Sequence, residues 1–261
     1  MAYTAISVKH TEGVDIVTLN RPDYLNAINN AMISELMDVV CKANLAGSKT
    51  RCILITGEGR GFCSGADLGA KDPAALTDSG TALLTTYNPL MTEMARSKVP
   101  IVCAINGIAA GAGMSIALAG DIVIAGRSAA FLQAFVNIGL VPDAGSSYIL
   151  PRLIGTARAK AMMMLGEKID AETAAEWGLV YKTVADEDLI DEAMKIARKF
   201  ASGPTIAYGA IRRLSRESQT NSLGEQLSLE AESQRLCNYT EDFLEGVTAF
   251  TQKRSAEFKG K

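Results

Sequence analysis

The sequence is poor in histidine: its 261 residues include a single one, His10, near the N-terminus. A metal site or a catalytic triad that depends on histidine is therefore not expected. The five cysteines are scattered and form neither a CxxC pair nor a cysteine–histidine cluster. An odd number of dispersed cysteines is typical of reduced thiols, which predicts a reducing, cytoplasmic location and no metal ion.

An excess of positive charge is also missing, with 26 Lys and Arg against 29 Asp and Glu. Neither nucleic acid nor a membrane surface is therefore an expected partner. The first residues, MAYTAISVKHTEG, lack the basic and apolar segments of a secretory signal. Residues 101–126 are apolar, but Asn106, Asp121 and four glycines interrupt them. They predict a strand, a glycine turn, a short buried helix and a second strand rather than a membrane span.

Hydrophobic periodicity predicts a mixed α/β chain. Alternating residues in 4–10 and 14–20 predict a β-hairpin around Gly13, and 50–59 predicts a buried strand that enters a glycine-rich loop. Strand-then-loop units recur at irregular spacing up to Gly155, and helical patterns dominate after it. We expect an α/β core followed by a helical C-terminal part. Helices are predicted within residues 31–46, 82–97, 156–180, 189–202, 204–218 and 241–255.

Two glycine-rich loops follow apolar strands, GEGRGFCSGADLG at 57–69 and NGIAAGAGMS at 106–115. Phe62 and Ile116 stand where a dinucleotide-binding fingerprint requires glycine, and no GxxxxGK[ST] motif occurs, so nucleotide binding is disfavoured.

The alternative chemistry for these loops is an oxyanion hole, in which two backbone N–H groups converge on a carbonyl oxygen that becomes negative. Ala66 and Ala112, each directly after a glycine, are the candidate donors. Tight strand-to-helix turns without any catalytic role would explain the same glycines.

A third feature is Asp143 in the stretch NIGLVPDAGSSYILPRLIG, where apolar residues flank it on both sides. A carboxylate in such surroundings is costly unless it is paired, hydrogen-bonded or used in chemistry. As a base, it would have a pKa raised by the apolar walls toward useful values. The alternative interpretation is a helix N-cap, a common position for aspartate.

Three segments together resemble the crotonase family, the enoyl-CoA hydratase/isomerase superfamily: RGFCSGADL, INGIAAGAGMSIALAGDIVIA, and 136–180 around GLVPDAG. The resemblance extends in order from about Val14 through the C-terminal helix. It implies a crotonase-like spiral of ββα units over 1–195, a C-terminal helical trimerisation region over 196–261, and an acyl-CoA substrate. The thioester oxygen would lie between the N–H groups of Ala66 and Ala112.

The resemblance also bears on the reaction. Hydratases of this family typically carry glutamates where Ser115 and Phe135 stand, and neither residue is a carboxylate base. Asp143 would then be the single base, as in double-bond isomerases. The arrangement is similar to Δ3,Δ2-enoyl-CoA isomerases and most closely to the isomerases that act on the ring epoxide of phenylacetyl-CoA.

Three other functions remain open. One is hydration of enoyl-CoA, and another is a non-catalytic CoA-binding role. The third is dehalogenation of the 4-chlorobenzoyl-CoA type, in which an aspartate is the nucleophile. That reaction pairs the aspartate with a histidine and a tryptophan, whereas His10 lies before the hairpin and Phe135 occupies the tryptophan position.

Substrate-binding residues are likewise implied by the resemblance, and no cofactor is expected, because coenzyme A is part of the substrate. Asp67 is expected to organise its loop and Cys63 to pack. The acyl pocket is expected to depend on Lys71 to Met94. Phe250 and Lys253 would reach the adenine and phosphates of CoA bound to a neighbouring subunit of a homotrimer or hexamer; an ordinary amphipathic helix is the alternative. The remaining expected substrate or CoA contacts are Leu25, Ala27, Gly65, Asp67, Leu68, Gly69, Gly111 and Phe135.

Overall fold

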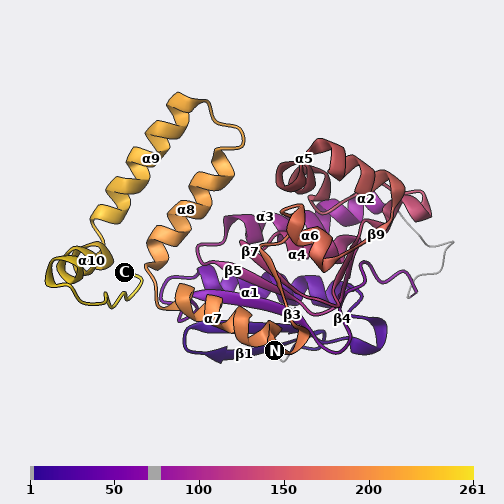
Figure 1. Ribbon diagram of the computed structural model, residues 1–261, viewed down its shortest axis with the longest axis horizontal. Coiled ribbons are helices and arrows are strands. Elements are labelled where there is room, and N and C mark those ends of the chain that lie inside the picture. Colours follow the sequence, from indigo (N-terminus) through magenta and orange to yellow (C-terminus); the bar gives the residue numbers. More distant parts are fainter. Residues whose placement is uncertain (1–2, 70–77) are drawn as a thin grey trace.

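The computed structural model describes residues 3–69 and 78–261 and contains two β-sheets with helices around them (Figure 1). The larger sheet has the strand order β1-β2-β3-β5-β7-β10 and the smaller sheet β4-β6-β8-β9. The larger sheet consists of β1 (Ile6–Thr11), β2 (Val14–Leu19), β3 (Cys52–Gly57), β5 (Ile101–Ile105), β7 (Ile122–Gly126) and β10 (Lys182–Val184). The smaller one consists of β4 (Gly61–Cys63), β6 (Ile108–Ala110), β8 (Ala130–Leu132) and β9 (Lys168–Asp170).

The chain winds as a spiral because each turn adds one strand to each sheet. The strand pairs β3 and β4, β5 and β6, and β7 and β8 follow one another in sequence. In the larger sheet β3 pairs in parallel with β5 and β5 with β7, and in the smaller sheet β4 pairs in parallel with β6 and β6 with β8. Helices complete the turns: α1 (Asn30–Asn44), α2 (Ser79–Ala82), α3 (Asn88–Arg96), α4 (Ala112–Leu118), α5 (Ser146–Leu165), α6 (Ala171–Glu176) and α7 (Leu189–Ala201). This architecture confirms the predicted crotonase-like spiral of ββα units.

The buried strands have two apolar faces, and successive residues point to opposite sides. In β3, Ile53 and Ile55 join a core cluster with α1, α3, α4 and α5, whereas Cys52 and Leu54 face α7. Helix α7 covers this second face from Leu189 to Ala201. The predicted boundary between residues 195 and 196 falls within α7, and the division into two domains at that point stays a prediction.

Several expectations for local structure are confirmed. Residues 6–19 form the predicted hairpin, with Glu12 and Gly13 at positive φ in its turn. Residues 101–126 form the expected first strand, β5, the buried helix α4 and the second strand, β7; the additional short strand β6 lies in the segment expected to be a glycine turn. Among residues 3–69 and 78–261, no helix has the length and apolar character needed to cross a membrane.

Other elements differ from expectation. The core does not end at Gly155, because β9 and β10 follow it and pair with β8 and β7. The helix expected over 82–97 contains a π-helical turn, Leu83–Tyr87, between α2 and α3. Helix α9 (Leu223–Asn238) was not predicted as a separate element.

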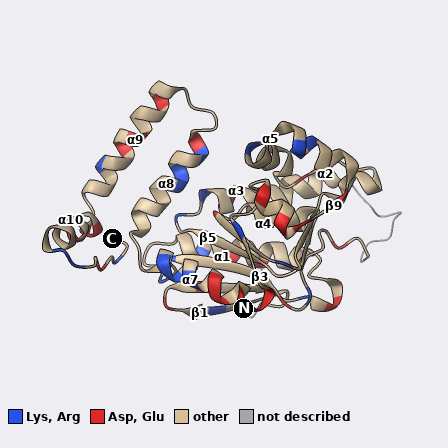
Figure 2. Cartoon of the chain, in the orientation of Figure 1, with Lys and Arg blue, Asp and Glu red and all other residues tan. Residues whose placement is uncertain are grey.

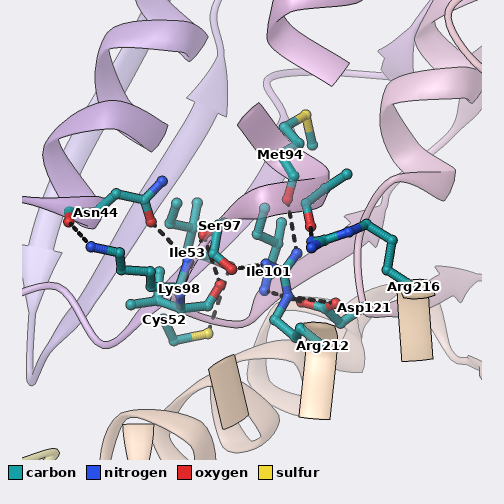
Figure 3. Close-up of polar contacts among 12 residues, drawn as sticks. Asn44, Cys52, Ile53, Met94, Ser97, Lys98, Ile101, Asp121, Arg212 and Arg216 are labelled. Carbon is teal, nitrogen blue, oxygen red and sulfur yellow. Dashed lines mark hydrogen bonds and ion pairs between the residues drawn. The ribbon is translucent and has the colours of Figure 1, made fainter. Parts of the chain in front are cut away.

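Helices α8 (Thr205–Glu217), α9 and α10 (Glu241–Gln252) form an arm, residues 205–261, that extends from the core (Figure 1). Arg212 of α8 attaches the arm: its Nε lies 2.7 Å from Asp121 Oδ2, and its Nη2 donates to the carbonyl of Met94 at 2.9 Å (Figure 3). Nearby, Arg216 donates to the carbonyl of Ala95. The charged residues of α8 are mainly arginines and those of α9 mainly glutamates (Figure 2).

Candidate active site

The first glycine loop leaves β4 and pairs with the segment after β2. Ile28 and Ala66 form an isolated parallel bridge, in which the N–H of Ile28 donates to Gly65 and the N–H of Asp67 donates to Ile28. Gly65 has a φ of +99°, a conformation that L side chains rarely adopt. In a parallel bridge of this kind, the N–H of the central residue, Ala66, points away from its partner strand.

Asp67 organises this loop, as expected. Its Oδ2 lies 2.8 Å from Nη2 of Arg21, and the same guanidinium donates to the carbonyl of Ala27. The predicted CoA-contacting backbone at Leu25 and Ala27 is therefore joined to the loop that carries Ala66, while Leu68 and Gly69 extend from the same loop into solvent.

The second glycine loop joins β6 directly to α4. Gly111 adopts a φ of +50°, and Ala112 is the first residue of the helix, so its N–H precedes the intrahelical hydrogen bonds. Gly113 packs tightly against β4, since a Cβ at this position would lie 2.6 Å from the carbonyl oxygen of Cys63. Small residues are needed here because the two loops approach each other through their backbones.

The contact between the loops lies immediately before both candidate donors. A Cβ on Gly65 would lie 3.0 Å from the carbonyl oxygen of Ala110, and one on Gly111 would lie 3.9 Å from Cα of Gly65. Across the described ranges, 3–69 and 78–261, no hydrogen bond uses the N–H of Ala66 or Ala112. The geometry thus brings two uncommitted backbone donors to one region, as an oxyanion hole requires.

Asp143 is not a helix cap. The N-cap of α5 is Gly145, and no side chain caps this helix, so the cap hypothesis is wrong. Instead, Oδ1 of Asp143 is buried and has no hydrogen-bond partner among the described residues. Burial raises the pKa of the Asp143 carboxyl to about 6. This is a carboxylate that can exchange a proton near neutral pH.

The turn that presents Asp143 is strained. Ala144 and Gly145 follow it with φ values of +46° and +84°, and a non-glycine residue in this region is uncommon. The main chain is held on the inner side by Ser115 of α4, whose hydroxyl lies 3.1 Å from the carbonyl oxygen of Asp143. Ser115 lies one turn along α4 from Ala112, so the aspartate and the second loop share the start of this helix.

Phe135 is buried beside the second loop, with its Cζ 3.7 Å from the position that a Cβ on Gly111 would take. It therefore supplies an apolar wall next to one candidate donor. Part of the region expected to shape the acyl pocket, residues 70–77, lies outside the described residues.

Two polar residues near these loops were not predicted. Tyr87 ends the π-helical turn, and burial together with the Asp143 carboxylate raises the pKa of its hydroxyl. Asn26 is fully buried and donates to the carbonyls of Glu58 and Gly61, which fixes the segment between Leu25 and Ala27. The sequence offers no signal for either, since both depend on contacts between distant segments.

The remaining candidates lie apart from this cluster or are inert. Phe250, which is 85% exposed, belongs to α10, and Lys253 directly follows this helix. Helix α10 lies at the far end of the arm, away from the glycine loops in Figure 1. Cys63 is buried in β4, and burial raises the pKa of its thiol to about 12. His10 pairs with Asp15 in the N-terminal hairpin at 2.6 Å.

Comparison with known proteins gives a consistent result. The family model described as enoyl-CoA hydratase/isomerase matches residues 9–261. The 1,2-epoxyphenylacetyl-CoA isomerase of Escherichia coli (strain K12) is 45% identical over 259 residues, 97% of this chain and 98% of the relative. A Rhodobacter capsulatus protein named "Probable enoyl-CoA hydratase" is 42% identical over 261 residues, 100% of both chains. The crystal structure of an enoyl-CoA hydratase from Bacillus anthracis has a TM-score of 0.92 at 32% identity, covering 99% of this chain and 100% of that chain.

Proposed function

Because the chain belongs to the enoyl-CoA hydratase/isomerase family, we propose that it is an acyl-CoA double-bond isomerase with Asp143 as its single base. The observation that carries this proposal is the buried, unpaired Oδ1 of Asp143, with a pKa raised to about 6. A proton shuttle works best when its pKa lies near the operating pH. Structural carboxylates are instead paired or hydrogen-bonded when they are buried.

In the proposed reaction, the thioester oxygen of a 3-enoyl-CoA accepts hydrogen bonds from the N–H groups of Ala66 and Ala112. The ionised Asp143 removes a proton from C2, and the electrons of that C–H bond form a dienolate whose negative oxygen lies between the two donors. The protonated Asp143 then delivers the proton to C4. The product is the conjugated 2-enoyl-CoA, and the aspartate returns to its ionised state.

Hydration is the second candidate, because the Rhodobacter capsulatus relative is named "Probable enoyl-CoA hydratase". The residues around the site favour isomerisation. Ser115 and Phe135 occupy the positions where hydratases of the family typically carry glutamates, and Phe135 is buried and apolar. The Escherichia coli relative, named a 1,2-epoxyphenylacetyl-CoA isomerase, supports the same choice and suggests an aromatic-acid-derived acyl group.

We further propose that the cytoplasmic enzyme is a trimer or a hexamer and needs no cofactor. In one protomer, Phe250 and Lys253 lie on the arm, so they would contact CoA bound to a neighbouring copy. Large apolar side chains remain exposed on the arm and need a partner. They include Leu223, Leu227, Leu236, Tyr239, Phe243, Leu244, Val247 and Phe250. Light scattering at micromolar concentration tests this proposal, and a stable monomer would contradict it.

The central test replaces Asp143 with asparagine. Asparagine keeps the size of the side chain but cannot carry the proton, so turnover of a 3-enoyl-CoA is expected to fall by about 10²- to 10⁴-fold. The dissociation constant of a saturated acyl-CoA is expected to stay near the wild-type value, because backbone donors on other loops hold the thioester.

Asp170→Asn is the matched control, since Asp170 caps α6 at an exposed position and asparagine caps equally well. Parallel assays with a 3-enoyl-CoA and a 2-enoyl-CoA separate the candidates. Isomerisation of the 3-enoyl ester creates a conjugated thioester, whereas hydration of the 2-enoyl ester removes the conjugation. Near-normal isomerisation by Asp143→Asn would refute the single-base mechanism.

A further inference from the structure

Below Asp143 lies a buried polar cluster that the proposed reaction does not use. Ser115, Gln133 and Ser146 come from α4, the end of β8 and the start of α5, and all three have no exposed surface. The hydroxyls of Ser115 and Ser146 are 2.6 Å apart, and Nε2 of Gln133 donates to the Ser146 hydroxyl at 3.1 Å. Burying polar groups in a core of this kind costs free energy unless they are hydrogen-bonded.

One direction of these hydrogen bonds uses every hydroxyl proton. Nε2 of Gln133 donates to Ser146, and Ser115 lies beside carbonyl oxygens that can only accept, so in this direction Ser146 donates to Ser115 and Ser115 donates to the main chain. Ser115 then donates to the carbonyl oxygen of Asp143 at 3.1 Å, a shorter separation than the 3.3 Å to Gly111. Every hydroxyl proton is used, although Oε1 of Gln133 is buried without a partner among the described residues. Aligned hydrogen bonds of this kind strengthen one another.

This series of hydrogen bonds ends at the backbone carbonyl of Asp143. The carbonyl oxygen of Asp143 accepts this hydrogen bond and a second one from the N–H of Ser146 at 3.0 Å. The left-handed Ala144 between them is a conformation that surrounding contacts must enforce. Without the hydroxyl of Ser115, the turn has one contact fewer with α4, the helix that also carries Ala112.

We propose that Ser115 is a positioning residue that, together with Ser146 and Gln133, holds Asp143 at the acyl chain and keeps its carboxylate out of water. This inference rests on the proposed function. It assigns a role to a residue that stands where hydratases carry a glutamate: the hydroxyl acts on Asp143 rather than on the substrate.

The test compares Ser115→Ala, Ser146→Ala and the double variant in the full-length enzyme, with kcat and KM for a 3-enoyl-CoA measured from about pH 5 to about pH 9. A displaced base is expected to lower kcat by up to about 10²-fold, while KM stays near the wild-type value. The acid limb of the profile is expected to move to lower pH, because a loosened turn admits water and the pKa of Asp143 falls. The double variant is expected to lose no more kcat than either single variant, because each substitution breaks the same series of hydrogen bonds.

Ser97→Ala is the matched control. Ser97 is 3% exposed, and its hydroxyl also donates to a backbone carbonyl, that of Val99 at 2.9 Å. Its removal is expected to lower stability without moving kcat or the acid limb. If Ser115→Ala does not fold, Ser146→Ala alone decides the question.

An unchanged kcat in the serine variants, or a lower kcat with an unmoved acid limb, overturns the positioning role. The two proposals fail separately. An active Asp143→Asn removes the single-base mechanism, whereas an inactive Asp143→Asn beside a fully active Ser115→Ala removes only the positioning role.

Discussion

Gly65 lies against Ala110 so closely that a single Cβ on the glycine would be 3.0 Å from the alanine carbonyl oxygen. This contact joins the two glycine loops one residue before Ala66 and two residues before Ala112. The position of each proposed donor is therefore set by the other loop as well as by its own.

Ala112→Pro tests the second donor. Residue 112 is the first position of α4, where proline fits the helix and removes only an N–H group. Turnover is expected to fall by about 10²-fold or more. Ala171→Pro is the matched control, because Ala171 is the buried first residue of α6. Circular dichroism checks the fold of both variants, and a folded Ala112→Pro with full activity would remove Ala112 from the oxyanion role.

The pH profile of kcat/KM tests the raised pKa of Asp143. The base must be ionised in the free enzyme, so kcat/KM is expected to be level above the pKa of about 6 and to fall at lower pH. The decrease approaches about tenfold per pH unit. An acid limb near the ordinary aspartate value of about 4 would show that the carboxylate is solvated.

The stability of Asp143→Asn gives an independent measurement. Burial raises the pKa of Asp143 from its ordinary 3.8 to about 6, so the folded state binds the proton more tightly than the unfolded state. Wild-type stability is therefore expected to fall as pH rises through this interval, and the asparagine variant lacks this loss. At about pH 8 the variant is expected to be more stable by up to about 2 kcal/mol, after allowance for the partial exposure of the side chain. Denaturant unfolding at about pH 4 and about pH 8 measures it; equal differences at both pH values would contradict the prediction.

Two neighbouring arginines of α8 allow a buried ion pair to be compared with an exposed one. Arg212, whose side chain is 8% exposed, bridges Asp121 and two carbonyls of the core, whereas the pair of Arg213 and Glu232 has side chains 47% and 61% exposed. Arg212→Ala is expected to destabilise the protein by about 3 kcal/mol and to weaken assembly through the arm. Arg213→Ala is expected to change stability by less than about 1 kcal/mol. Denaturant titration and light scattering measure the two effects, and equal losses would contradict this prediction.

The sequence predicted most of the strands and helices whose own patterns are strong. Strand β3 has an apolar run from Cys52 to Ile55, and α1 has a regular buried stripe. By contrast, β9 has only three residues, two of them exposed, so no apolar run marks it. In α9 only Leu229 and Ser233 are buried, and its apolar residues do not gather on one face.

The approach of the two glycine loops was predictable to the same extent, and the catalytic roles of the site residues stay predictions. The motifs that contain Ala66, Ala112 and Asp143 are each contiguous in sequence. The loops of the first two residues meet as expected. The series of hydrogen bonds from Gln133 through Ser146 to Ser115 was not predictable. Its members are 13 to 31 residues apart and meet only when β8, α4 and α5 pack. Local pattern does not encode such a contact.

The spiral divides the proposed chemistry among its turns. The loop after β4 carries Ala66, the loop after β6 carries Ala112, and the segment after β8 carries Asp143, so three successive turns each supply one group. In the proposed reaction, recognition of the thioester belongs to the first two turns and proton transfer to the third. A change confined to the third turn can therefore alter which reaction occurs while the handling of coenzyme A esters is inherited intact, and this architecture is suited to diversification by one segment at a time.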